Sequence, residues 1–238
     1  MTAADIRLGR WQDVLADVEC DACIFDAPYG ARTHKGHDAS KAIIGTRELS
    51  FKPLGYGALT DEDAHAVVDH WSPRTRGWLC SLTSHDLIPA WESALAAAGR
   101  YVFAPLPIID RGSRPRLTGD GPACWSVWMI VARPRTAAFS RWGSLPGVYQ
   151  RELQDQRPAG IMGGKPLGVM RAIVRDYSRS GDLVCDPFAG HGTTLKAAVM
   201  EGRRAVGSEV DPDAHAACVS RLSDTPTMPA RDGTLALF

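Results

Sequence analysis

The stretch DLVCDPFAGHGTTLKAAVMEGRRAVGSEVD, residues 182–211, contains a strand, a turn, a helix and a second strand in succession. An apolar strand ends at Asp186, a turn with Gly190 and Gly192 opens the helix, and the second strand ends in Glu209. In an open α/β sheet, glycines let the backbone approach a nucleoside, helix N–H groups face it, and an acid about 20 residues later accepts from ribose hydroxyls. This pattern predicts a nucleoside-binding turn.

A dinucleotide oxidoreductase is the first alternative for such a turn. The sequence reads G-x-G-T, and it lacks the third glycine of G-x-G-x-x-G. Asp186 and Phe188 add an acid and an aromatic ring, which suit a cationic, adenine-bearing molecule better than a pyrophosphate. A tight turn without a ligand is the other alternative, and Glu209 would then be coincidental.

A second stretch, ACIFDAPYGARTHKGHD at residues 22–38, raises a different question. An apolar run enters Asp26-Ala27-Pro28-Tyr29, and the chain then becomes polar, small and basic. An ordinary exit from a strand explains the proline, because proline and glycine end strands. The other interpretation is a site that grips a flat, hydrogen-bonding substrate. These residues alone leave both interpretations open.

Composition limits the class of protein. The chain has 238 residues, 45% of them hydrophobic and 23% charged, as expected for a soluble globular domain. It contains no apolar run of about 18 residues and no apolar centre of a signal peptide near its start, which predicts a cytoplasmic protein without a membrane partner. Lys plus Arg and Asp plus Glu both total 27, so any nucleic-acid surface must be local.

The six cysteines are scattered and mostly lie in apolar runs, which favours reduced core thiols over disulfides. Cys20-x-x-Cys23 has the spacing of half a zinc site. No second pair and no well-spaced histidines follow it, so the sequence predicts no metal. Three arginines spaced four apart on an expected helix are interpreted as a solvated face, namely Arg171, Arg175 and Arg179.

Alternating short apolar strands and helical patterns predict a mostly parallel sheet covered on both faces. A helix is expected over residues 60–72, with Thr60 as its cap, and another is expected to stop at Gly99. Residues 135–162 show no strong period and are rich in Gly and Pro, so they are interpreted as a long loop or small insert. The expected organisation is one domain over residues 1–222 and a tail over 223–238.

Both stretches resemble the beta group of amino-methylating DNA methyltransferases, which use S-adenosylmethionine. Asp26-Ala27-Pro28-Tyr29 is similar to the catalytic D-P-P-Y of that group, and Gly164-Lys165-Pro166 is similar to a third motif that encloses the methionine end of the cofactor. The turn is similar to the cofactor motif, whose members here are Asp186, Pro187, Phe188, Ala189, Gly190, Gly192 and Thr193, with Glu209 at the end of the next strand.

The resemblance implies an α/β, Rossmann-like class I methyltransferase fold of about seven strands, one of them antiparallel. The catalytic motif precedes the cofactor motif, which is the circularly permuted order of the beta group. In this group, target recognition falls in the segment that corresponds to residues 135–162. The bound cofactor would be held by the turn, Glu209, Lys165 and Pro166.

The resemblance also implies a mechanism. Asp26 would accept one hydrogen bond from the exocyclic amine of a base, and the carbonyl of Ala27 would accept the other. Pro28 would fix the bend, and Tyr29 would stack on a base flipped from the duplex. Ala27 stands where the family usually has Pro, which keeps the carbonyl acceptor and loses rigidity.

The function implied is methylation of the N6 amino group of adenine in DNA, because Asp at the first catalytic position favours adenine. Cytosine-N4 methylation is the nearest alternative, and a non-catalytic methyltransferase-like binding protein is the rival from another class. A restriction-modification companion, a regulator and a phage self-protection enzyme all stay open, as does a homodimer. Candidate DNA contacts are Lys35, Arg111, Arg114 and Arg116.

Overall fold

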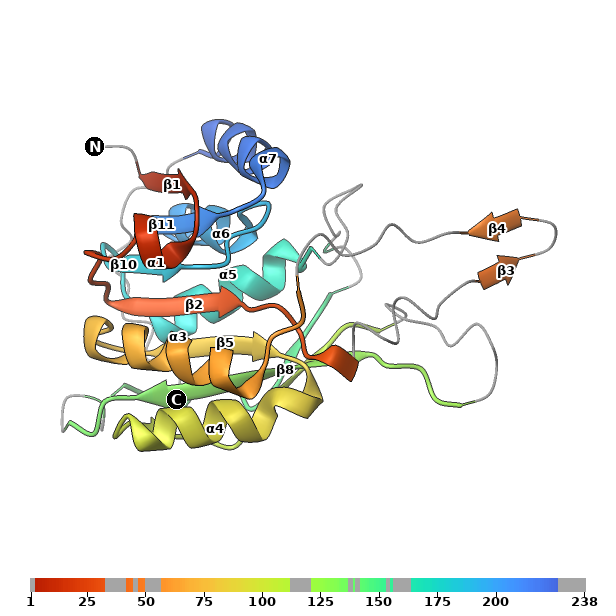
Figure 1. The fold of residues 1–238 in the computed structure, drawn as a ribbon. Helices are drawn as coiled ribbons and strands as arrows, with labels where there is room; N and C mark the ends of the chain where they lie inside the picture. Colours follow the sequence, from red (N-terminus) through yellow and green to blue (C-terminus); the bar gives the residue numbers. More distant parts are fainter. Residues whose placement is uncertain are drawn as a thin grey trace. The chain divides into compact units, whose positions relative to one another are not determined.

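The computed structural model describes residues 3–32, 42–44, 47–49, 57–111, 121–136, 139, 142–152, 155 and 164–226. The chain divides into two compact units. The first unit comprises Met1–Asp26, Pro73–Cys80 and Glu152–Phe238, and the second comprises Ala27–Ser72 and Ser81–Arg151. Figure 1 labels helices and strands of both units.

The first unit is built on a row of parallel strands. The order is β1 (Ala4–Leu8), β11 (Arg204–Glu209), β10 (Leu183–Asp186) and β2 (Ala22–Asp26), followed by the start of β5 (Leu79–Thr83). The β1–β11, β10–β11 and β10–β2 pairs are parallel. Most side chains of β2 and β10 are fully buried, as expected for a sheet covered on both faces.

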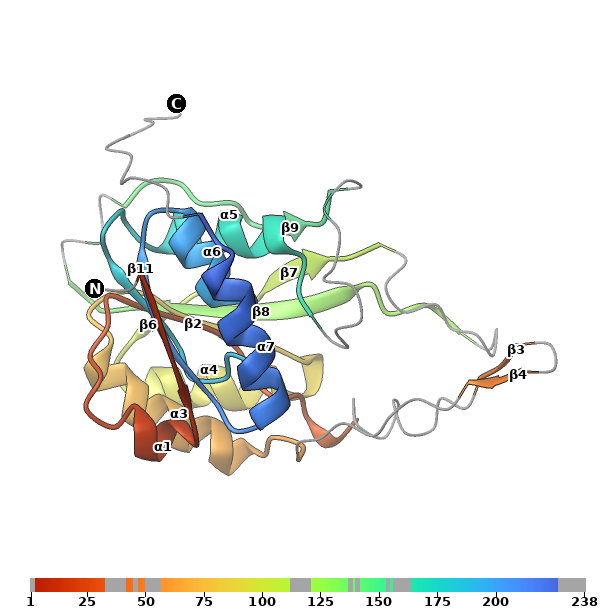
Figure 2. The same cartoon turned by 90° about the horizontal axis from the view of Figure 1, so that it is seen from above.

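The helices of this unit are α1 (Trp11–Val14), α5 (Leu167–Tyr177), α6 (Thr193–Met200) and α7 (Pro212–Ser223). Figure 2 shows α5 and α6 side by side, and α6 packs on β10 and β11 while α7 packs on β1 and β11. Asp211 caps α7, because its Oδ1 accepts from the N–H groups of Asp213 and Ala214 at 2.8 and 2.9 Å.

The second unit contains the last residues of β5, a 3-10 turn (His85–Leu87), α4 (Ile88–Ala97) and most of α3 (Asp61–Arg74). Its further strands are β6 (Tyr101–Val102), β7 (Leu106–Ile109), β8 (Ser126–Arg133) and β9 (Tyr149–Gln150). Strand β8 is antiparallel to β6 and β7, whereas β7 and β9 are parallel. Strands β3 (Ala42–Ile44) and β4 (Arg47–Leu49) form a separate antiparallel pair.

The predicted start of α3 is confirmed. Thr60 Oγ1 accepts from Asp63 N at 3.2 Å, and Asp63 Oδ2 accepts from Thr60 N at 3.0 Å, which is a reciprocal capping box. The helix runs two residues beyond the predicted end, to Arg74, and includes Pro73. The predicted stop after α4 is also confirmed, because Gly99 has a φ of +76°.

The α/β class and the mostly parallel first unit agree with the sequence prediction, but the number of strands differs. About seven were expected, and the described residues contain eleven, of which β3 and β4 form their own pair. Strand β7 was not predicted, because it contains Pro107, and a proline inside an apolar run argues against a strand. Strand β9 is two residues long and lies in a stretch without a clear period.

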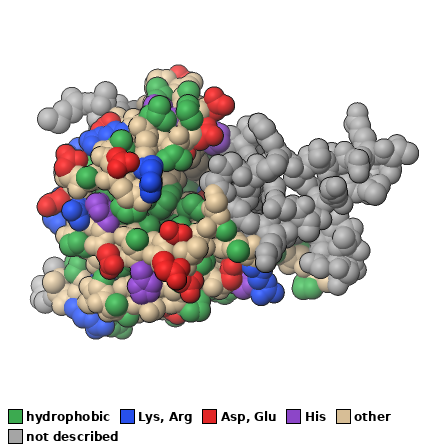
Figure 3. Space-filling view, viewed as in Figure 1, with side chains coloured by type: hydrophobic (Ala, Val, Ile, Leu, Met, Phe, Trp, Pro, Cys, Tyr) green, Lys and Arg blue, Asp and Glu red, His purple; other side chains and the backbone are tan. Residues whose placement is uncertain are grey.

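Charged side chains of both signs are interspersed on the visible face of the described residues in Figure 3. This distribution is consistent with the equal totals of basic and acidic residues. Among the helices of the described part of the chain, none combines the length and the apolarity needed to cross a bilayer.

Candidate active site

Three acids end neighbouring strands of the first unit. Asp26 is the last residue of β2, Asp186 the last of β10, and Glu209 the last of β11. Because these strands are parallel neighbours, their carboxyl ends lie at one edge of the sheet. The structure therefore brings the acids of the two predicted motifs to the same edge.

The glycine turn between β10 and α6 has a conformation that requires glycine. Gly190 and Gly192 have φ values of +52° and +76°, and Gly192 N donates to Ala189 O at 2.7 Å. Gly192 is the N-cap of α6, and a Cβ at this position would overlap Cys218 Sγ of α7. The close packing of α7 on the turn thus excludes every larger residue at position 192.

Glu209 fixes this turn through both carboxylate oxygens. Oε2 accepts from Gly190 N at 2.8 Å, and Oε1 accepts from Asp211 N at 2.8 Å. A carboxylate offers about four lone-pair sites, so two remain for a ligand. The predicted ribose-binding acid is therefore also the residue that joins the turn to the end of β11.

Asp186 is buried beneath the turn, with 1% of its surface exposed. Burial raises the pKa of its carboxyl to about 7, and the charges of Asp26 and Glu209 act in the same direction. Hydrogen bonds from the Thr194 side chain and from Phe188 N, the latter at 3.0 Å, oppose this rise. The Asp186 carboxyl therefore changes between its protonated and its ionised form near neutral pH.

The remaining residues of the predicted cofactor motif pack inside the first unit. The Phe188 ring contacts Phe25 of β2, with centroids 5.6 Å apart. Ser208 Oγ donates to Pro187 O at 3.0 Å, and Ala189 N donates to Ser208 O at 3.0 Å. Arg221 of α7 donates to His191 O at 2.5 Å and to Thr193 Oγ1 at 3.4 Å.

Lys165 contacts the catalytic-motif acid. Its Nζ donates to Asp26 Oδ2 in an ion pair whose side chains are 12% and 27% exposed. Asp26 Oδ1 is also buried, and it has no hydrogen-bond partner among the described residues. The predicted role of Lys165 was cofactor binding, and the contact with an acid 139 residues away was not predicted.

A residue that sequence reasoning missed positions the segment that carries Lys165. Asp155 accepts from Gly168 N at 3.0 Å and from Val169 N at 3.2 Å, at the first turn of α5. Helix α5 begins at Leu167, directly after Lys165 and Pro166. The sequence does not reveal Asp155 as a cap of α5, because this acid lies twelve residues before the helix begins.

Ala27, Pro28 and Tyr29 open the second unit, and the backbone after them is held by hydrogen bonds. Tyr29 O accepts from Leu59 N at 3.1 Å, and Gly30 N donates to Ser84 Oγ at 3.1 Å. Ala27 is buried, with 3% of its surface exposed. A Cβ on Gly30 would overlap the carboxylate of Asp86, so a larger residue here would have to displace that side chain.

Of the four basic residues predicted to contact DNA, Lys35, Arg114 and Arg116 lie outside the described residues. Arg111 is exposed at the end of β7, and its carbonyl accepts from Arg151 Nη2 at 3.1 Å. The Arg151 Nε pairs with Asp110 Oδ1 at 2.6 Å. These bonds fix the backbone from which the Arg111 side chain extends.

Arg175 and Arg179 are exposed, as the interpretation of a solvated face predicts, and Arg171 and Arg175 also lie near an acid of α6. Arg171 Nε pairs with Glu201 Oε1 at 2.7 Å, and Arg175 Nη1 lies 3.9 Å from Glu201 Oε2. Glu201 is the C-cap residue of α6, so the contacts join α5 to the end of α6. The arginines thus have a packing role inside the first unit.

An α/β fold with a glycine turn and acids at the ends of neighbouring parallel strands is the architecture of the class I methyltransferases, and in this chain the catalytic motif precedes the cofactor motif. Comparison with protein families identifies the family within this class. Residues 91–220, more than half of the chain, match the DNA methylase family. The chain belongs to this family, the amino DNA methylases of the N6/N4 type.

One curated relative is the type II methyltransferase M.MjaI of Methanocaldococcus jannaschii. It is 46% identical over 104 residues, which cover 44% of this chain and 33% of the relative. The chain spans a third or less of the length of the first curated relatives that it matches.

Among solved structures, the complex of M1.HpyAVI with S-adenosylmethionine superposes with a TM-score of 0.65 at 17% identity, covering 92% of this chain and 98% of the other. The PvuII DNA methyltransferase, described as cytosine-N4-specific, gives a TM-score of 0.60 at 14% identity, with coverage of 92% and 88%. At these identities the likeness shows the shared fold alone.

Proposed function

We propose that this protein transfers the methyl group of S-adenosylmethionine to the exocyclic amino nitrogen of a base in DNA, and that the base is adenine, methylated at N6. Family membership supports the amino DNA methylase class. The observation that carries the catalytic assignment is the hydrogen bonding of the two Asp26 carboxylate oxygens.

Asp26 has one oxygen engaged and one available. Oδ2 accepts from Lys165 Nζ, whereas the buried Oδ1 accepts no hydrogen bond within the described part of the chain. A buried acceptor without a partner costs about 1–3 kcal/mol, so a fold retains it where a ligand completes it. An amino N–H of the substrate base is a donor of the required kind.

Lys165 supplies a positive charge next to the Asp26 carboxylate. The Lys165 side chain is 12% exposed and its ammonium group contacts the carboxylate directly, so it offsets the cost of a charge at a partly buried position. The ionised carboxylate is a stronger hydrogen-bond acceptor than the neutral acid. Lys165 therefore acts in the proposed reaction as a positioning and charge-balancing residue for Asp26.

The three residues after Asp26 have complementary roles in the proposal. The amine of adenine is a poor nucleophile, because its lone pair is delocalised into the ring. Hydrogen bonds to the Asp26 carboxylate and to the Ala27 carbonyl let the nitrogen become pyramidal and expose its lone pair. Pro28 holds the bend of the chain, and the Tyr29 ring stacks on the flipped base.

The cofactor would be held by residues of the first unit. The residues fit such a group, because the positive-φ glycines bring the backbone to the ligand and Glu209 retains lone pairs for ribose hydroxyls. When bound, S-adenosylmethionine supplies a methyl group activated by its sulfonium. Asp186 lies beneath the turn, and a cationic ligand there would favour the ionised form of its carboxyl.

The proposed reaction balances without a metal or a redox partner. One N–C bond forms on the base as one S–C bond breaks, and the methylated amine then loses one proton. Asp26 accepts this proton through the hydrogen bond that it already makes to the amine, and it passes the proton to solvent. Neutral S-adenosylhomocysteine and methyladenine leave the site.

The decisive experiment is transfer of labelled methyl from S-adenosylmethionine to unmethylated genomic DNA, with identification of the modified nucleoside. Wild type would be compared with Asp26→Asn, which keeps the shape of the side chain and removes its charge. Asp17→Asn is a matched control, because Asp17 is a surface acid of the first unit with 87% of its side chain exposed.

We expect N6-methyladenine from wild type and from Asp17→Asn, and a loss on the order of 10²-fold or more with Asp26→Asn. N4-methylcytosine in place of methyladenine would overturn the base assignment and keep the chemistry. Tight cofactor binding without label on any DNA would overturn the enzyme assignment and favour a non-catalytic binding protein.

A further inference from the structure

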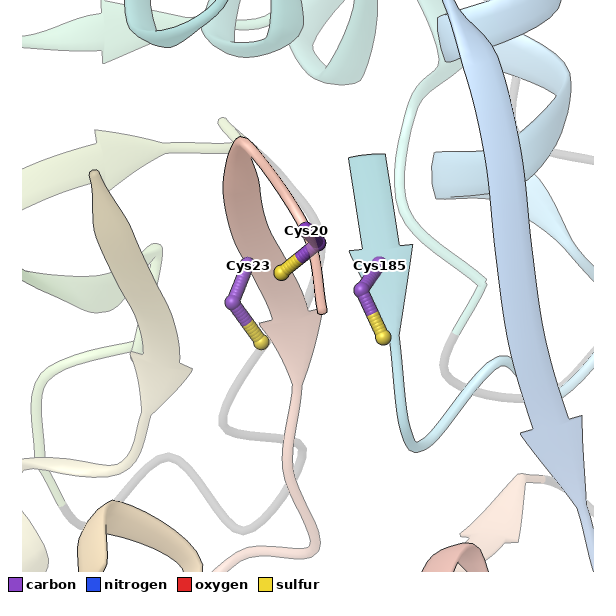
Figure 4. A group of neighbouring side chains, drawn as sticks. All are labelled: Cys20, Cys23 and Cys185. Atoms are coloured by element: carbon purple, nitrogen blue, oxygen red, sulfur yellow. The ribbon is translucent and has the colours of Figure 1, made fainter. Parts of the chain in front are cut away.

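Three cysteines converge inside the first unit, and none of them has a role in the proposed methyl transfer. Cys20, Cys23 and Cys185 are each fully buried, and their sulfur atoms all lie within 4.8 Å of one another. Figure 4 shows Cys23 on β2, Cys185 on β10 and Cys20 on the segment that leads into β2. The spacing Cys20-x-x-Cys23 is half a zinc site in sequence, and Cys185 adds a third thiol from a distant part of the chain.

The backbone holds these thiols in place without any ligand. Cys23 and Cys185 are direct partners in the parallel register of β2 and β10. Cys20 N donates to Arg74 O, and Arg76 N donates to Cys20 O, both at 2.9 Å. Because strands and a backbone bridge fix all three Cα positions, a bound ion would need only small side-chain rotations.

A fourth donor lies beside the cluster. Thr75 is 3% exposed, and its Oγ1 lies 3.5 Å from Cys20 Sγ. Tetrahedral zinc with bonds of about 2.3 Å to sulfur and 2.1 Å to oxygen has S···S edges of about 3.8 Å and S···O edges of about 3.6 Å. The Cys20–Thr75 separation matches such an edge, and the sulfur pairs need to close by about 1 Å or less.

We infer that Cys20, Cys23 and Cys185 form a structural Zn²⁺ site, with the Thr75 hydroxyl or a water molecule as the fourth ligand. Three S–H groups lose their protons to solvent as three Zn–S bonds form, and no oxidation state changes. The ion joins β2, β10 and the residue-75 segment, so it stabilises the sheet where Cys185 directly precedes Asp186 at the end of β10.

Zinc is preferred over other thiophilic ions on charge and geometry. Three thiolates with Zn²⁺ leave one negative charge in a buried site, whereas Cu⁺ would leave two, and buried uncompensated charge is costly. A hydroxyl oxygen beside the thiols suits a four-coordinate ion that accepts mixed sulfur and oxygen ligands. The alternative is three reduced thiols that pack as small apolar side chains.

The test is zinc content after the purified full chain is incubated with Zn²⁺ and dialysed, measured by elemental analysis. Cys20→Ala, Cys23→Ala and Cys185→Ala each remove one ligand. Cys80→Ala is the matched control, because Cys80 is a buried cysteine of β5 outside the cluster, and Cys124→Ser removes the exposed thiol. We expect about one zinc per chain in wild type and both controls, and less than about a tenth in the three variants.

X-ray absorption at the zinc edge of wild-type protein keeps the inference testable even where a variant fails to fold. We expect three sulfur neighbours at about 2.3 Å and one lighter atom at about 2.1 Å. No retained zinc in wild type, two or fewer sulfur neighbours, or unchanged zinc in all three variants would each overturn the site.

The zinc measurement is independent of the proposed methyl transfer. Asp26→Asn leaves the three thiols and Thr75 intact, so it should retain the same zinc content as wild type. A wild type with full zinc content and no methyl transfer would count against the catalytic proposal alone, and methyl transfer by a zinc-free wild type would count against the zinc site alone.

Discussion

The glycine turn after β10 and the acid at the end of β2 use their polar groups in opposite ways. In the turn, Gly190 N, Gly192 N and both oxygens of Glu209 are hydrogen-bonded within the protein. Asp26, by contrast, keeps one buried carboxylate oxygen without a partner among the described residues. The turn is thus held by internal hydrogen bonds without a ligand, whereas under the proposed function a substrate would complete the bonds of Asp26.

If this contrast holds, changes in the turn should lower stability, and changes around Asp26 should mainly lower activity. The largest expected effect is on the turn. Gly192→Ala places a Cβ at positive φ and against Cys218 Sγ, so we expect a loss of about 2–5 kcal/mol in the free energy of unfolding. Urea denaturation measures it.

Gly99→Ala is the matched control for this change. Gly99 has the same φ of +76°, but a Cβ there meets no atom within 4 Å. The Gly99→Ala variant should lose only the stability that a side chain at positive φ costs, about 1–2 kcal/mol. Its cofactor affinity should be unchanged. Equal losses in the two variants would show that contact with α7 contributes nothing.

The next effect concerns Asp186 and pH. Its folded-state pKa is raised to about 7 by burial, so between about pH 4 and pH 7 the folded state binds more protons than the unfolded state. The contribution of Asp186 to the free energy of unfolding is therefore fully present at low pH. It is lost as the pH rises through the pKa of the folded state, and the loss amounts to at most about 4 kcal/mol.

Urea midpoints across this pH range would measure the decline. Asp186→Asn removes the titrating group, so the fall in stability over this window should become smaller. A variant with the same pH dependence as wild type would mean that another group controls it.

Lys165→Gln tests the prediction that changes around Asp26 mainly lower activity. We expect kcat to fall on the order of 10²-fold, because Asp26 loses its charge partner, while cofactor affinity changes by less than about threefold. Lys196→Gln, on α6, is the control for loss of a lysine. A large loss of cofactor affinity with kcat retained would return Lys165 to the cofactor role that the family resemblance implied.

The smallest expected effect is at the contact between α5 and α6. Arg171→Gln breaks the pair with Glu201, in which the arginine side chain is 39% exposed, so we expect a stability loss below about 1 kcal/mol. DNA affinity should be unchanged in a titration at fixed salt. A marked fall in DNA affinity would place this helix face on the nucleic acid.

Sequence reasoning was most successful where local pattern determines structure. Strand β10, the turn, helix α6 and strand β11 were all predicted around the right residues, because buried strands, a cap and positive-φ glycines each leave a local signal. The position of Glu209 at a strand end followed from the same spacing. The predicted roles of these residues in binding and catalysis remain predictions.

Contacts between distant segments could not be read in this way. The pair of Lys165 with Asp26 and the approach of Cys185 to Cys20 and Cys23 depend on which strands are neighbours and in which register. Neither strand order nor register leaves a local trace in the sequence. Strand β7 was missed for a different reason, because Pro107 occupies a position where proline is rare.

The bond from Arg221 to the His191 carbonyl has a practical consequence for engineering. Helix α7 follows all three motifs in the chain, yet its arginine and Cys218 both contact the glycine turn. A chain shortened before residue 212 would keep every motif residue and lose these supports. Fusions, split versions and minimal versions of this protein should therefore retain α7.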